Sequence, residues 1–111
     1  MRACRVAIAL MLLAVLSACG TAKVGRDFAL AAFESGVQRG TTTQLQVRGW
    51  LGAPAGVGVS VDTGGTLYDE WTYFYGEGQI PDAANARLKI LQIKFDQQGV
   101  VRGYNWSDER N

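Results

Sequence analysis

The segment ARLKILQIKFDQQGVVRGYNW, residues 86–106, decides the predicted fold. Apolar and polar residues alternate along it up to the polar turn DQQG, and a second strand-like run follows. Because side chains of a β-strand alternate between two faces, this pattern predicts two antiparallel strands joined by the turn. The face expected to be buried on the first strand carries Leu91, Ile93 and Phe95. Lys89 begins the same face, and we expect it to be the exception to burial there.

A third strand is predicted upstream, over residues 67–75, after a turn at residues 63–65. Its aromatic residues Trp71, Tyr73 and Tyr75 share one face. We expect them to form half the core of a small domain. The alternative is that the aromatic run is a ligand platform or a surface on which nucleic-acid bases stack.

The strongest helix signal is RGTTTQLQVRGWLGAP, residues 39–54. Thr42 or Thr43 can cap the start of this helix by accepting a hydrogen bond from a free backbone N–H. Gly52 stands where a left-handed residue would end the helix, and Pro54 prevents its continuation.

A first helix is predicted over residues 27–38, with Asp27 as its cap. Leu30, Phe33 and Val37 fall on one face of it, at spacings of three and four residues. The order of two helices followed by antiparallel strands predicts an α+β domain, with the helices on one face of the sheet.

The N-terminal residues have the pattern of a secretory signal peptide. Arg2 and Arg5 precede an unbroken apolar run of 11 residues, VAIALMLLAVL, and small residues follow it. Eleven helical residues span about 16 Å, too short for a bilayer core of roughly 30 Å. The alternative is a single membrane-spanning helix, but polar and glycine residues from Gly20 onward end the apolar stretch at once.

The sequence LSAC, which ends at Cys19, resembles the bacterial lipobox. In lipoproteins a peptidase cuts before this cysteine, which becomes acylated. The resemblance divides the chain into a lipoprotein signal peptide (1–18), a lipidated tether (19–26) and one domain (27–111). Ordinary cleavage is the alternative. It would leave Cys19 as a free thiol or half a disulfide, because the other cysteine, Cys4, lies in the removed segment.

An acylated Cys19 would anchor the protein in membrane lipid. In Gram-negative lipoproteins an aspartate after the cysteine tends to signal inner-membrane retention, and here Gly20 stands in that position. The chain therefore resembles the class sorted to the outer membrane. We expect a lipid-anchored outer-membrane protein of a Gram-negative bacterium whose domain faces the periplasm.

Few residues of the predicted mature chain are of types that support catalysis or metal binding. The chain has no histidine, so the commonest general base and metal ligand is absent. Without Arg2 and Arg5, 9 of the 11 basic side chains remain against 10 acidic ones, so no basic character indicates nucleic acid. Asp69 and Glu70 are adjacent, and on a strand they face opposite sides and form no carboxylate pair. We expect no enzymatic activity, no metal site, no cofactor and no nucleic-acid partner.

Two sets of apolar residues are candidates for binding a partner. Ile80 lies in the polar loop GEGQIPDAANAR, and Pro81 would stiffen this loop and lower the cost of ordering it. The alternative for Ile80 is a lid folded over the core. Tyr68 and Phe74 lie on the strand face opposite the predicted core and would form an outward aromatic pair.

Together these motifs resemble the SmpA/OmlA (BamE-like) family of outer-membrane lipoproteins. The lipobox cysteine is followed by a short tether and by a helix that ends in Gly-x-Pro. A W-x-Y strand and a strand ending in F-D-x-x-G-x-V come next. The matching residues after the cysteine are Thr43, Val47, Leu51, Gly52, Pro54, Trp71, Tyr73, Phe95, Asp96, Gly99 and Val101.

The resemblance implies two helices packed on a three-stranded antiparallel sheet. It also implies a non-catalytic accessory role in the assembly of outer-membrane β-barrel proteins, which supports envelope integrity. Its implied partners are other outer-membrane assembly proteins and anionic phospholipid. The alternative is a stand-alone periplasmic module of a β-lactamase-inhibitor-like fold that binds an unrelated protein.

Overall fold

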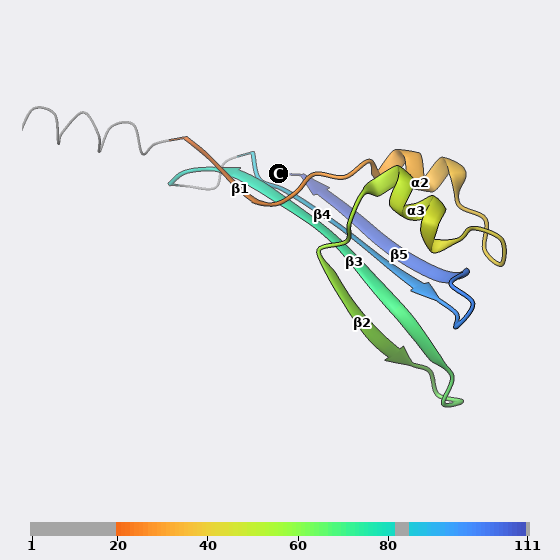
Figure 1. The fold of residues 1–111 in the computed structure, drawn as a ribbon. Coiled ribbons are helices and arrows are strands. Elements are labelled where there is room, and N and C mark those ends of the chain that lie inside the picture. The colour runs from red at the N-terminus through yellow and green to blue at the C-terminus, as the bar shows by residue number, and fades with distance from the viewer. Residues whose placement is uncertain (1–19, 82–84, 111) are drawn as a thin grey trace, which may run out of the picture.

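The computed structural model describes residues 20–81 and 85–110. The predicted signal peptide and the lipidation site Cys19 lie outside these residues. Within them the chain forms two helices and one antiparallel sheet of five strands (Figure 1). The elements are β1 (Thr21–Gly25), α2 (Leu30–Gly36), α3 (Gln44–Leu51), β2 (Gly56–Val61), β3 (Leu67–Gln79), β4 (Arg87–Phe95) and β5 (Val101–Arg110).

The prediction of a three-stranded sheet is therefore wrong, and the two additional strands explain the difference. Strands β3, β4 and β5 form the expected antiparallel meander, and β1 and β2 both pair with β3 on its other side. β3 has 13 residues and is about 43 Å long, so β1 and β2 can pair with different parts of the same edge of β3. β2 pairs with residues 67–72 and β1 with residues 75–79.

The three-strand prediction left these strands out, although strand-like alternation begins at Gly56, and neither strand contributes to the core. The segment TAKVG of β1 was expected to be part of a tether, and every one of its residues is exposed. In β2 the sequence GVGVSV alternates as a strand should, yet its three valines are exposed. Hydrophobic periodicity locates strands that bury a face, and these two are held by backbone pairing with β3 instead.

The second helix begins where the sequence predicts, at a capping box. The Thr43 side chain accepts from the backbone N–H of Gln46, and the Gln46 side chain accepts from the backbone N–H of Thr43. Gly52 ends the helix with φ +80° and ψ −162°. The positive φ is as expected, but ψ lies outside the left-handed helical region and in one that is essentially restricted to glycine.

The first helix is shorter than predicted and lacks the predicted cap. It begins at Leu30, after Ala29, which has no capping side chain. Asp27 instead accepts from the backbone N–H of Phe28 at 2.9 Å and forms an ion pair with Lys89. The carboxylate therefore ties the entry segment of the domain to the sheet instead of capping the helix.

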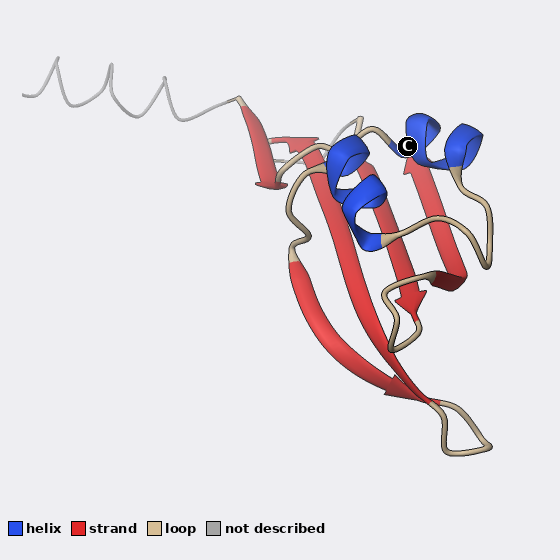
Figure 2. Cartoon of the chain, turned by 45° about the vertical axis from the view of Figure 1, so that its right-hand side comes forward, coloured by secondary structure: helices blue, strands red, loops and turns tan. Residues whose placement is uncertain are grey.

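The core lies between the two helices and one face of the sheet (Figure 2). The predicted strand faces are confirmed, because Trp71, Tyr73 and Tyr75 are all buried. The remaining core residues are Phe28, Leu30, Phe33, Val47, Leu51, Leu91, Ile93, Phe95 and Val101.

Lys89 is buried as well, so its predicted exclusion from the buried face is wrong. It is only 4% exposed. Its ammonium group donates to the carbonyl oxygen of Phe28 at 2.6 Å, lies 2.5 Å from the carboxylate of Asp27, and sits 4.6 Å from the centre of the Phe28 ring. These partners lie 61 and 62 residues earlier in the chain, so sequence periodicity could not reveal them.

Candidate functional site

The sheet face that the helices leave uncovered carries an apolar hollow at the β1 end. Gly76 of β3 pairs with Val24 of β1 on one side and with Leu88 of β4 on the other. A Cβ atom at Gly76 would lie 3.7 Å from the Leu88 side chain and 3.8 Å from that of Phe74. The missing side chain at Gly76 thus leaves a hollow of about 430 Å³ lined by the Val24, Phe74 and Leu88 side chains.

A second hollow, of about 310 Å³, adjoins the first through Val24 and Ala86. Ile80 and Pro81 line it. We call the combined surface of Val24, Phe74, Ile80, Pro81 and Leu88 the anchor-side patch. Three of these side chains are well exposed: Val24 at 62%, Ile80 at 46% and Leu88 at 41%. An apolar surface of this kind, on a face that no helix covers, is typical of a binding site.

The patch lies beside the point where the predicted anchor enters the domain. The backbone N–H of Ile80 donates to the carbonyl oxygen of Gly20 at 2.6 Å. Gly20 directly follows Cys19. The residue after the predicted lipidation site is therefore hydrogen-bonded to the backbone of the patch.

The structure places three of the four tentative binding residues along the two adjoining hollows. Ile80 and Pro81 line one hollow, and Phe74, six residues before Ile80, lines the other. Ile80 and Pro81 are exposed, and Phe74 is half-buried on the same face of the sheet. Ile80 does not belong to the core, so it is no lid over it. Sequence reasoning missed Val24 and Leu88, because only the pairing of β1 and β4 with Gly76 shows that they are neighbours.

Tyr68 lies elsewhere. It is six residues from Phe74 along β3, about 20 Å away, so the two form no aromatic pair. Its hydroxyl donates to the carboxylate of Asp62 at 3.2 Å, inside the turn between β2 and β3. The backbone N–H of Thr66 also donates to this carboxylate and is the main cause that lowers the pKa of Asp62. Tyr68 therefore has a structural partner in its own hairpin.

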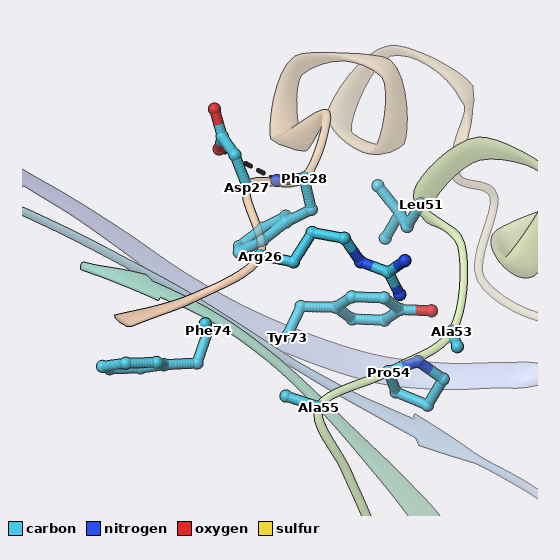
Figure 3. Close-up of a pocket in the computed structure, with 10 residues that line it drawn as sticks. Arg26, Asp27, Phe28, Leu51, Ala53, Pro54, Ala55, Tyr73 and Phe74 are labelled. Carbon is cyan, nitrogen blue, oxygen red and sulfur yellow. Dashed lines mark hydrogen bonds between the residues drawn. The ribbon is translucent and has the colours of Figure 1, made fainter. Parts of the chain in front are cut away.

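A further hollow, of about 220 Å³, lies between the entry segment and the end of α3 (Figure 3). Figure 3 shows the Arg26 side chain beside the rings of Phe28 and Tyr73. The Tyr73 hydroxyl donates to the carbonyl oxygen of Gly52 at 2.8 Å, and burial raises the pKa of Tyr73 to about 12. Tyr73 thus stays protonated at neutral pH and links the sheet to the end of α3.

The described residues contain little that could perform chemistry. Residues 20–81 and 85–110 include no group of three or more acidic, cysteine or histidine residues that could hold a metal ion. Neither helix in these ranges is long and apolar enough to cross a membrane. Exposed apolar side chains lie at the anchor-side patch and along β2.

The chain matches no family model, no curated protein and no solved structure.

Proposed function

We propose that this chain is a non-catalytic, lipid-anchored outer-membrane protein that binds other proteins as an accessory of outer-membrane β-barrel assembly. The observation that carries the proposal is the position of the anchor-side patch. Its Ile80 backbone bonds to Gly20, the residue after the lipobox cysteine. A membrane anchor would therefore present the patch at the membrane surface, where membrane-bound partners are found.

The composition of the patch suits a protein partner. Ile80 and Leu88 are close to half exposed, and Val24 is exposed still further. Burying such side chains on association is favourable by about 25 cal/mol per Å² of apolar surface. Glu109 of β5 pairs with Leu88 and places a charged residue at the border of the patch, and a polar rim around an apolar centre is the usual anatomy of an interface.

The experiment that tests this proposal is affinity purification from detergent-solubilised outer membranes. The mature protein should co-purify with subunits of the barrel-assembly machinery. The double variant Ile80→Ser and Pro81→Gly should recover much less of them, because it removes two of the five apolar side chains of the patch. Both side chains are exposed, so the variant should melt within a few degrees of the parent.

Leu45 provides the matched control. It is 82% exposed on α3, on the other side of the sheet. Leu45→Ser should leave partner recovery unchanged. Equal recovery from the double variant and the parent would overturn the assignment of the patch as the binding site.

The second candidate is a stand-alone periplasmic module that binds a protein unrelated to barrel assembly. The five-stranded sheet favours it, because the family resemblance implies only three strands. Purification distinguishes the two candidates, since assembly subunits should be recovered only under the first.

A further inference from the structure

Strand β2 forms an open edge of the sheet and lacks the usual protection. It pairs with β3 on one side, and no described strand pairs with its other side. Its sequence GVGVSV has no charged residue and no proline. The side chains of Val57, Val59 and Val61 are 70%, 68% and 59% exposed. Edge strands commonly carry lysine, proline or a bulge to prevent pairing with another chain, so an unprotected edge of this kind is suited to pairing.

The free hydrogen-bonding groups of this edge belong to the valines. The backbone N–H of Asp62 donates to the carbonyl oxygen of Thr66, at the turn end of the β2–β3 pair. In an antiparallel pair, alternate residues direct both backbone groups toward the same neighbour. The even-numbered residues of β2 therefore bond to β3. The N–H and C=O groups of Val57, Val59 and Val61 point to the open side.

We propose that β2 pairs antiparallel with β2 of a second copy of this chain. The two strands would meet about a two-fold axis perpendicular to the sheet. Val59 would lie opposite Val59 of the other copy, and Val57 opposite Val61. The residues between them would pair Gly58 with Ser60. The interface is then isologous, and two five-stranded sheets become one continuous sheet.

The sequence of β2 favours this partner because it is complementary to itself. All odd positions are valine and all even positions are glycine or serine. In the proposed register valine always faces valine, and cross-strand pairs of β-branched residues stabilise a sheet. A register shifted by one residue in either direction would place no valine opposite valine, but opposite glycine, serine or Asp62.

Charge also permits the pairing. The charged residue nearest to β2 in the chain is Asp62, directly after Val61. In the proposed register Asp62 lies opposite Gly56 of the other copy, so the two carboxylates are about 20 Å apart along the strands. This separation exceeds the Debye length of about 8 Å at physiological salt, so their repulsion is screened.

The direction of the axis fits two copies in one membrane, and this point rests on the proposed lipid anchor. A rotation about an axis perpendicular to the sheet leaves heights along that axis unchanged. Gly20 of both copies would therefore lie in the same plane, and both anchors could enter the same bilayer.

Cross-linking between introduced cysteines in native membranes tests the pairing and its register. Val59→Cys in the full chain should give a dimer-sized adduct with a short thiol-to-thiol cross-linker, and the parent chain should give none. Val57→Cys alone should not react with itself, because its two copies would lie about 14 Å apart. Membranes that contain both Val57→Cys and Val61→Cys should give the adduct again.

Two further variants show whether the contact is specific. Adding Val61→Lys to Val59→Cys should lower the adduct yield several-fold, because it places a charge in the valine row. Adding Leu45→Lys should not change the yield, since Leu45 lies on α3. A folded Val59→Cys chain whose thiol reacts with maleimide yet forms no dimer would overturn the proposal, and so would adducts to other proteins only. Neither result depends on whether assembly subunits co-purify.

Discussion

Lys89 shows how one residue can join two distant parts of the chain. Its ammonium group is buried among the Asp27 carboxylate, the Phe28 carbonyl and the Phe28 ring. A buried charge is costly unless it is paired and hydrogen-bonded. Here the entry segment supplies all three partners, so Lys89 fixes the position of this segment against the sheet.

We expect Asp27→Asn to destabilise the domain because it leaves the Lys89 charge with weaker compensation. The Asp27 side chain is 56% exposed, so water already screens part of the interaction. The loss should therefore be about 1 kcal/mol, near the lower end for charge-assisted hydrogen bonds. Denaturant unfolding at pH 7 measures it. A variant as stable as the parent would show that the ion pair contributes nothing.

The domain should also lose stability in acid, and Asp27 should account for part of the loss. The hydrogen bond from Lys89 is the main cause that lowers the pKa of Asp27 below its ordinary 3.8. A carboxyl whose pKa is lower in the folded state stabilises fully above its unfolded pKa. This stabilisation is lost as the pH falls through about 4 toward the folded value.

Unfolding free energies measured between pH 6 and pH 3 test this expectation. The decrease should be smaller in Asp27→Asn than in the parent. The variant should still lose some stability, because hydrogen bonds or ion pairs also lower the pKa values of Asp62, Asp96 and Asp108. Identical pH dependence in the two proteins would contradict the assigned role of Asp27.

At the scale of elements, α3 contains one glycine and ends at another. Adding a side chain should change the stability of the domain in opposite directions at these two positions. Gly52 has φ +80° and ψ −162°, so Gly52→Val should cost about 1–3 kcal/mol. A Cβ there would meet only Arg26, at 4.0 Å, so the cost is conformational. Gly49 is in the helix, and nothing lies within 4 Å of a Cβ there. Gly49→Ala should stabilise by up to about 1 kcal/mol.

Thermal melts of the two variants beside the parent provide the measurement. Gly52→Val should melt several degrees lower and Gly49→Ala at or above the parent. Shifts of equal sign would mean that the end of α3 has been misplaced.

The sequence predicted the elements that bury side chains. It did not predict the elements whose side chains stay exposed. The alternation in β3 and β4 located the buried faces, and the threonine cap of α3 located its start. β1 was missed because all of its residues are exposed, and the start of the first helix was misplaced because Asp27 bonds to Lys89 instead of capping the helix. Only part of the candidate site could be predicted from the sequence. Ile80 is conspicuous in a polar loop, whereas its neighbours become visible only once the strands are paired.

At the scale of the molecule, the length of β3 separates two surfaces. One end of β3 pairs with β1 and carries the anchor-side patch, and the other end pairs with β2. The proposed partner binding and the proposed pairing between copies therefore involve different parts of one strand. Substitutions at the β2 edge should leave the anchor-side patch intact, which allows the two proposals to be tested separately.

The anchor itself provides a prediction about the whole chain. Cys19→Ala should prevent lipid attachment and leave the precursor uncut or misprocessed, because the LSAC motif loses its cysteine. Mass spectrometry of the parent protein from membranes should find Cys19 as an acylated N-terminus. An unmodified Cys19, or a mature chain that begins elsewhere, would contradict the lipid anchor.

The most direct test of the proposed function is site-specific photo-cross-linking in living cells, with the photoreactive residue at position 80. Position 45 serves as the control, because Leu45 is even more exposed but lies on α3, away from the anchor-side patch. Our account predicts adducts from position 80 to subunits of the outer-membrane β-barrel assembly machinery, and none of these from position 45. Adducts from position 80 that contain no assembly subunit, or the same adducts from both positions, would contradict it.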